Sequence, residues 1–185
     1  HDTAGNGNTA STSTDNSVRL DRQAPQIIAR ETVDLDHNGQ IDGIRCIFSE
    51  PIRDATVRPA DFAVAGVAAV TGTITDGSAP ADSIIIVTFA NEPGLSTGAT
   101  PAVQYTQGTL ADMAGNLPAN DGPVPAADGA APVPLSAVAD DNATSGFGID
   151  SDDTVTITFS ENTTAPALTS ASIDAVLALG GGHTW

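Results

Sequence analysis

The chain has 185 residues, of which 40% are apolar, and it carries a formal net charge of −17 at pH 7. Its six Lys and Arg side chains are all arginines between Arg19 and Arg58, and such an excess of carboxylates disfavours nucleic acid and anionic membranes as partners. No apolar run approaches the roughly 18 residues of a transmembrane helix, so membrane insertion is not expected. Aromatic residues make up only 4% of the chain, so aliphatic residues and threonine must fill any core, which suits thin β layers.

Residues 1–21 begin with the motif Asp-x-Ala-Gly-Asn at positions 2–6 and continue with a stretch rich in Ser, Thr and Asn. Taken alone, this composition is typical of a disordered tail. The same motif recurs at 112–116, however, 110 residues further on. The recurrence predicts that 1–21 is the C-terminal strand or tail of a preceding module.

Residues 22–127 contain short apolar stretches separated by polar turns, a pattern typical of antiparallel β-structure. Strands are expected over six ranges: 26–33, 44–49, 61–64, 67–75, 83–89 and 102–106. The range 83–89 is the most apolar and is predicted to be a central strand. A segment rich in Pro, Gly and Ala is expected to close the module.

The second of these stretches alternates, with Ile44, Cys46 and Phe48 pointing to one face. This periodicity predicts a half-buried strand. Cys46 is the only cysteine, so no internal disulfide is possible, and its place between Ile44 and Phe48 predicts a small buried side chain. No basic neighbour on that face lowers its pKa, which argues against a catalytic thiol.

Residues 34–42, here called the 34–42 loop, place oxygen donors at alternate positions around Gly39. The candidate ligands are the carboxylates of Asp34, Asp36 and Asp42, the amide oxygen of Asn38 and the backbone carbonyl of Gln40. Ca²⁺ takes six to eight oxygens, and this spacing in a tight turn delivers them. The alternative is an Asp-rich turn whose carboxylates cap backbone amides.

The 34–42 loop is not an EF-hand, because the twelfth position counted from Asp34 is Arg45 instead of a bidentate glutamate. A further oxygen is therefore needed, and Glu31 and Asp128 are the candidates. The motif at 112–116 has a simpler interpretation as a turn. There Asp112 caps the turn and glycine takes a positive φ, and metal ligation is the lesser alternative.

Two further landmarks from the first 50 residues recur in residues 128–185. Asp-x-x-Ala-Pro stands at 21–25 and again at 128–132, and Phe-Ser-Glu stands at 48–50 and again at 159–161. Together with Asp-x-Ala-Gly-Asn they repeat in the same order, at distances of 107 to 111 residues. That period is the size of one β-sandwich domain. We therefore interpret 22–127 as one complete module and 128–185 as the N-terminal part of a following module.

Within 128–185, the acidic residues Asp150, Asp152 and Asp153 precede the alternating stretch 154–160. They predict a second cation site, with a solvated acidic loop as the alternative. The segment 128–185 is well short of one period, and half a sandwich exposes an apolar face and unpaired edges. Either the natural chain continues or another chain supplies the missing strands, and we favour the first.

The order of the motifs Asp-x-Asp-x-Asn-Gly-x-Ile-Asp, Phe-Ser-Glu-Pro, Ala-Asp-Phe, Thr-Gly-Ala-Thr-Pro and Asp-x-Ala-Gly-Asn resembles the bacterial immunoglobulin-like repeats of S-layer proteins, large adhesins and multidomain cell-surface proteins. The resemblance covers 22–127 and, in part, 128–185, which lacks the Asn-Gly loop. It implies tandem immunoglobulin-like β-sandwich modules of about seven strands each, in arrays at the cell surface that Ca²⁺ often stiffens.

The expected function is structural: a Ca²⁺-stiffened segment of an extracellular surface protein, in contact with neighbouring modules or with copies of itself. No enzyme is expected, because Ser49 and Ser160 lack the setting of a nucleophile elbow and no phosphate-binding loop is present. One alternative is a filament subunit in which residues 1–21 complete a neighbour's sandwich by β-strand addition. Another is an accessory module of a secreted hydrolase.

Overall fold

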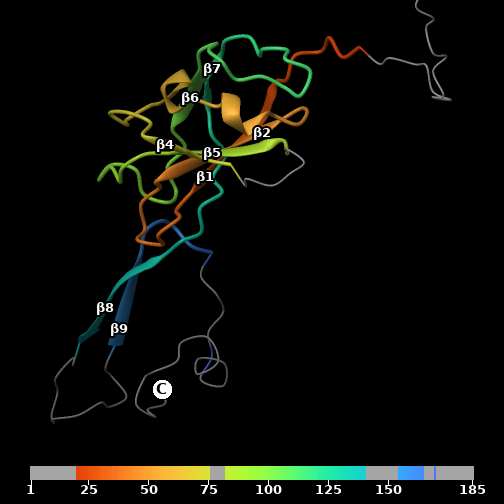
Figure 1. The fold of residues 1–185 in the computed structure, drawn as a ribbon. Coiled ribbons are helices and arrows are strands. Elements are labelled where there is room, and N and C mark those ends of the chain that lie inside the picture. Colours follow the sequence, from red (N-terminus) through yellow and green to blue (C-terminus); the bar gives the residue numbers. More distant parts are fainter. Residues whose placement is uncertain (1–19, 76–81, 141–153, 165–168, 170–185) are drawn as a thin grey trace, which may run out of the picture.

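The computed structural model describes residues 20–75, 82–140, 154–164 and 169 (Figure 1). In this part of the chain the regular elements are antiparallel strands and two short 3₁₀ helices, so the predicted all-β class is confirmed. The strands are β1 (Ile27–Val33), β2 (Gly43–Phe48), β3 (Phe62–Val64), β4 (Gly72–Ile74), β5 (Ile84–Thr88), β6 (Ala102–Tyr105), β7 (Asp121–Pro125), β8 (Pro134–Asp140) and β9 (Thr154–Phe159). The 3₁₀ helices are η1 (Asp54–Thr56) and η2 (Pro59–Asp61).

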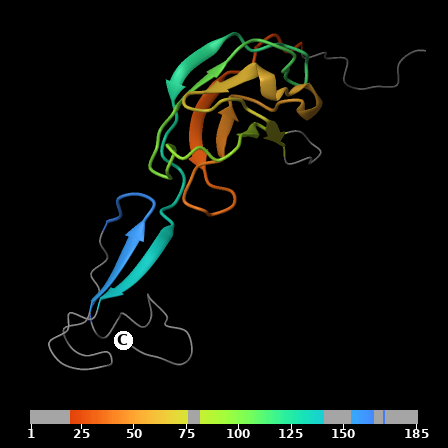
Figure 2. The same ribbon diagram turned by 90° about the vertical axis from the view of Figure 1, so that its left-hand side faces the viewer.

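Strands β1 to β7 form two sheets that face each other (Figures 1 and 2). One sheet has the order β1-β2-β5-β4 and the other has the order β3-β6-β7. Strand β5 lies between β2 and β4, as its apolar sequence predicts. Its alternate residues Ile85 and Val87 are buried between the sheets.

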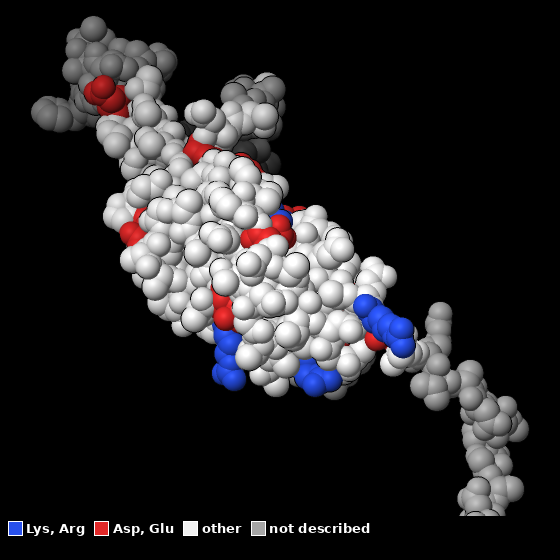
Figure 3. Space-filling view, turned by 90° about the horizontal axis from the view of Figure 1, so that it is seen from above, with Lys and Arg blue, Asp and Glu red and all other residues white. Residues whose placement is uncertain are grey.

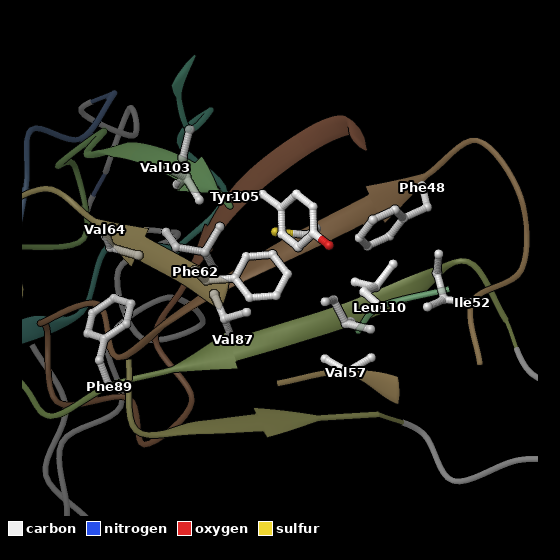
Figure 4. Close-up of a cluster of buried hydrophobic side chains, with 14 of the residues drawn as sticks. Phe48, Ile52, Val57, Phe62, Val64, Val87, Phe89, Val103, Tyr105 and Leu110 are labelled. Carbon is white, nitrogen blue, oxygen red and sulfur yellow. The ribbon is translucent and has the colours of Figure 1, made fainter. Parts of the chain in front are cut away.

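The core lies between the two sheets and is built by the period-2 alternation of the strands. On β2, Ile44 and Cys46 are fully buried and Phe48 is 2% exposed, as predicted. From the facing sheet, Phe62 and Tyr105 contribute a tilted ring pair with centroids 5.2 Å apart (Figure 4). Burial raises the pKa of the Cys46 thiol to about 12, so the thiol is not poised for nucleophilic chemistry.

The predicted elements differ from the observed ones mainly at the sheet edges. The strand expected over 67–75 is limited to β4, and β7 lies within the Pro/Gly/Ala-rich segment, for which the sequence predicts no strand. Among the described strands, β7 pairs with β6 alone, so Pro123 and Pro125 lie on an edge strand, where a missing amide donor is tolerated.

The hairpin β8–β9 reproduces the hairpin β1–β2 residue by residue. Its Cα pairs follow from those of β1–β2 by adding 107 on the first strand and 111 on the second, and both hairpins shift register after the first pair. The serine after each second strand also repeats. Ser49 Oγ accepts the Gln26 N–H at 3.0 Å, and Ser160 Oγ accepts the Val133 N–H at 2.9 Å. The sequence repeat is therefore also a repeat of backbone geometry.

The hairpin projects from the end of the sandwich at which β1 ends and the 34–42 loop begins (Figures 1 and 2). Residues 126–133 connect β7 to β8 along this end. Ala127 there accepts the Thr32 N–H through its carbonyl at 3.0 Å, and the Thr32 hydroxyl accepts the Gly129 N–H at 3.0 Å. The connection between β7 and β8 is thus held against β1 by hydrogen bonds.

Candidate metal centre and module junction

The 34–42 loop brings its three carboxylates together. Carboxylate oxygens of Asp34, Asp36 and Asp42 all lie within 4.8 Å of one another. Two closely spaced tight bends make this possible, because His37 has φ 57° and Gly39 has φ 90°, both in the left-handed region. The alternation seen in the sequence therefore produces a convergent acidic cluster.

The same loop also makes the hydrogen bonds of the alternative interpretation, in which carboxylates cap backbone amides. Asp34 accepts the N–H groups of Asn38 and Gly39 at 3.2 and 2.9 Å. Asp42 accepts the Leu35 N–H at 2.8 Å, and the amide oxygen of Asn38 accepts the Gln40 N–H at 2.9 Å. These bonds hold the carboxylates in place, and at least one oxygen of each carboxylate retains a lone pair for a cation.

Among the residues that the structure describes, no basic side chain forms an ion pair with this cluster. Within the described ranges, the ion pairs are Arg45 with Glu31 at 2.8 Å and Arg30 with Asp121. Glu31 is therefore engaged away from the loop. Partial burial, together with the charges of Asp36 and Asp34, raises the pKa of the Asp42 carboxyl.

The 34–42 loop also lies directly against the β8–β9 hairpin. A Cβ atom built on Gly39 would lie 2.5 Å from Leu135 Cδ2 and 3.1 Å from Ser160 Cβ, so this contact requires glycine. Beside it, the Thr97 and Ser160 hydroxyls are 2.5 Å apart. The loop that gathers the carboxylates is thus part of the surface on which the hairpin rests.

A cavity of about 600 Å³ lies at this junction. It is lined by residues of the sandwich, the connection and the hairpin: Ser96, Gly98, Asp128, Phe159, Ser160, Glu161 and Asn162. Asp128, which the sequence offers as a further oxygen ligand, belongs to this cavity and not to the three-carboxylate cluster. Most of the lining is polar, so the cavity suits water and ions more than an apolar ligand.

A second acidic cluster lies at the opposite end of β1. Carboxylate oxygens of Asp21, Glu50 and Asp112 lie within 4.8 Å of one another. Sequence reasoning missed this cluster, because its members are far apart in the chain and the sequence around Asp112 indicates a turn. The sequence does contain a signal for this cluster, because Asp21, Glu50 and Asp112 each belong to one of the three repeated motifs.

The members of this second cluster differ in protonation chemistry. Burial would raise the pKa of Asp112, but hydrogen bonds from the Asn116 side chain and from backbone N–H groups of the turn outweigh burial and lower it. Burial and the charges of Asp21 and Asp112 raise the pKa of Glu50. Glu50 Oε1 is buried and lacks a hydrogen-bond partner within the described part of the chain. The turn interpretation of 112–116 agrees with the φ of 94° at Gly115.

The junction cavity contains the repeat counterparts of two members of that cluster. Asp128 follows Asp21 by 107 residues, and Glu161 follows Glu50 by 111. Both counterparts line the cavity at the start of the hairpin. The acidic residues therefore recur at the entrance to each repeated hairpin.

Residues Asp150, Asp152 and Asp153 lie outside the described residues, as do residues 1–19 of the segment expected to end a preceding module. Carboxylates are scattered over the face shown in Figure 3, whereas most of the visible arginine surface lies along one margin. In the described ranges, no helix has the length and hydropathy needed to cross a bilayer.

Comparisons with protein-family models, curated proteins and solved structures gave no match.

Proposed function

We propose that this chain is a structural segment of tandem immunoglobulin-like modules from an extracellular surface protein, with junctions stiffened by Ca²⁺. The sheet orders β1-β2-β5-β4 and β3-β6-β7 support the immunoglobulin-like assignment, because a constant-type domain has four strands in one sheet and three in the other in the same order. The register shared by β1–β2 and β8–β9 supports 22–127 as one module and 128–185 as the opening of the next.

The observation that carries the role of Ca²⁺ is the contact of Gly39 with Leu135 and Ser160. The loop that gathers three carboxylates is the same loop that touches the next hairpin. Without a cation, repulsion between Asp34, Asp36 and Asp42 favours an expanded loop. A bound cation removes that repulsion and fixes the surface against which the hairpin packs. The carboxylates, the Gln40 carbonyl and water together supply the oxygen ligands that Ca²⁺ prefers.

Calorimetric titration of the whole chain with Ca²⁺ tests this role. We expect saturable binding that Asp36→Asn weakens at least about tenfold, since a carboxylate ligand becomes a neutral amide. Asp54→Asn, in η1 and outside both acidic clusters, is the matched control and should bind as the parent does. Glu50→Gln separates any contribution of the second cluster. Absence of heat and of a melting shift at millimolar Ca²⁺ would reject the proposal.

The filament alternative is favoured by one observation, the exposure of the hairpin. Val155 on β9 is 42% exposed and Phe159 is 36% exposed. In this alternative, residues 1–21 of another copy ladder onto the hairpin. Cross-linking between a cysteine placed in residues 8–20 of one copy and one placed on β9 of another distinguishes it from the tandem-module proposal.

A further inference from the structure

Strand β9 has one edge paired with β8 and one edge with which no other described strand pairs. Its sequence is Thr-Val-Thr-Ile-Thr-Phe, which is uncharged, free of proline and strongly β-forming. Val155, Ile157 and Phe159 occupy alternate positions and so share one face of the strand. A strand edge of this kind, with an apolar face, is a ready template for pairing with another strand.

The complete sandwich shows what covers the same edge and face of a matching hairpin. The counterparts of Val155, Ile157 and Phe159 are Ile44, Cys46 and Phe48, all 2% exposed or less. Strand β5 pairs antiparallel with the second edge of β2, and its buried residues lie beside those of β2 on the same face of the sheet. Ile85 is the register partner of Cys46, and Val87 is the register partner of Ile44.

We infer that β9 is an acceptor for an antiparallel strand of the β5 type, an extended uncharged segment with apolar residues at alternate positions. The register follows from the repeat. A residue equivalent to Ile85 stands opposite Ile157, and a residue equivalent to Val87 stands opposite Val155. Strand β5 of the same chain does not serve, because β2 and β4 already occupy both of its edges. The inference rests on the register of the hairpin and does not require the cation role.

The chemistry of the edge selects this partner over an acidic one. Residues 154–159 carry no charge, so an uncharged strand approaches without repulsion, whereas Asp128 and Glu161 near the end of β9 repel an acidic segment. Backbone hydrogen bonds supply affinity along the edge. The alternate apolar side chains supply the register.

A peptide of residues 82–91, which contains β5 and in which Asp82 is replaced by serine so that no side chain is charged, is the probe for the whole chain. We expect ¹⁵N-labelled chain to show peptide-induced shifts on β9 and cross-strand contacts between Val155 and the peptide residue at position 87. A control peptide carries Ile85→Thr and Val87→Thr, which keep β-propensity and remove the apolar side chains. It should bind at least about tenfold more weakly, because two buried apolar contacts are lost.

A matched pair of protein variants locates the binding. Ile157→Thr removes an apolar side chain from the proposed acceptor face and should weaken the 82–91 peptide about tenfold. Val138→Thr makes a similar change on β8, whose second edge would remain outside the new pairing, and should leave affinity unchanged. Backbone contacts between positions 137 and 157 verify that the hairpin persists in both variants, since these two positions are paired.

Three results would overturn the inference. Equal binding by the two peptides would show that alternation is not recognised. Binding of a peptide of residues 1–21 to β9 in preference to 82–91 would assign the edge to strand complementation by that segment. A dimer in sedimentation whose interface the ¹⁵N shifts place on β9 would show that a second copy of the chain occupies the edge. A monomeric chain that binds 82–91 with the expected register supports the inference.

Discussion

The hydroxyls of Thr97 and Ser160 lie 2.5 Å apart and join the sandwich to the β8–β9 hairpin by a hydrogen bond. Thr97 is fully buried, and Ser160 Oγ also accepts the Val133 N–H. In the complete sandwich the repeat counterpart of Ser160 is Ser49, whose hydroxyl accepts the equivalent N–H of Gln26. Ser49 and Ser160 thus share the hydrogen bond within the hairpin, and Ser160 makes an additional one to Thr97 across the junction.

Ser160→Ala should loosen the junction without unfolding the sandwich. The hydrogen bonds of Ser160 Oγ with the Thr97 hydroxyl and with the Val133 N–H are both lost, which costs about 1–3 kcal/mol locally. Amide relaxation should show β8–β9 tumbling more independently of β1–β7, while the melting temperature of the sandwich stays unchanged. The control Ser49→Ala should do the reverse and lower that melting temperature. Unchanged relaxation in Ser160→Ala would contradict a role for this bond in holding the junction.

Gly39→Ala should destabilise the contact between loop and hairpin for two separable reasons. The φ of 90° is unfavourable for alanine by about 1 kcal/mol, and the new methyl group would lie 2.5 Å from Leu135 Cδ2. Gly115→Ala is a matched control, because Gly115 has φ 94° but nothing within 4 Å of a built Cβ.

Thermal unfolding and relaxation of the hairpin measure both glycine variants. Gly115→Ala should show the cost of backbone strain alone, and Gly39→Ala should also detach the hairpin. Leu135→Ala in the Gly39→Ala background should restore part of the junction by removing the clash. A junction unaffected by Gly39→Ala would disprove the contact.

Asp42→Asn should stabilise the chain at neutral pH when Ca²⁺ is chelated. The raised pKa of Asp42 means that its stabilising contribution is present below the ordinary carboxyl pKa near 4 and is lost as pH rises through the higher folded value. At pH 7 the ionised carboxylate therefore works against folding. The gain should be below about 1 kcal/mol, because the group is partly solvated.

In saturating Ca²⁺ the Asp42→Asn variant should instead be less stable than the parent, since the substitution removes a proposed ligand. Urea denaturation measures the free energy of unfolding of both proteins in chelator and in Ca²⁺, each at pH 7 and near pH 4. Near pH 4 in chelator the two proteins should converge. A stabilising effect of Asp42→Asn that persists unchanged in Ca²⁺ would exclude Asp42 as a ligand.

Glu50 and Asp112 should respond to neutralisation in opposite directions. The raised pKa of Glu50 implies stability that is lost as pH rises, so Glu50→Gln should raise the melting temperature at pH 7 in chelator. The lowered pKa of Asp112 implies stability present above the ordinary carboxyl pKa and lost as pH falls through the folded value.

Asp112→Asn should therefore lower stability at pH 7, by about 1–3 kcal/mol, because the buried carboxylate accepts backbone and side-chain donors that an amide satisfies only in part. Thermal unfolding of both variants beside Asp54→Asn provides the comparison. Effects of the same sign for Glu50→Gln and Asp112→Asn would contradict the opposed pKa shifts.

The ion pair of Arg30 with Asp121 joins β1 of one sheet to β7 of the other. The Arg30 side chain is 6% exposed and that of Asp121 is 35% exposed, so removing the acid leaves a nearly buried guanidinium without its charge partner. Asp121→Asn should cost about 1–3 kcal/mol in urea denaturation. Arg30→Met removes the charge itself and should cost less. The opposite ranking would show that packing of the arginine stem, and not its charge, holds β7.

The local pattern of the sequence was sufficient for the β class, for β2 and β5, and for the burial of Cys46. Alternation within a strand depends only on neighbours two residues apart, so it can be read without the fold. The convergence of Asp34, Asp36 and Asp42 is local in the same sense. Strand β7 was missed because its prolines argue against a strand, and only pairing along one edge makes them tolerable.

The tertiary structure alone decided which distant residues meet. Asp21, Glu50 and Asp112 are separated by up to 91 residues in sequence, and only the packing of the linker and the 112–116 turn at one end of β1 places their carboxylates together. Gly39 against Leu135 is a contact of the same kind. The sequence determined strands such as β2 and β5 and the period of the repeat, because these follow from short-range alternation and from motifs in order. Contacts across the junction depend on how the folded units are oriented, and no short-range pattern encodes that orientation.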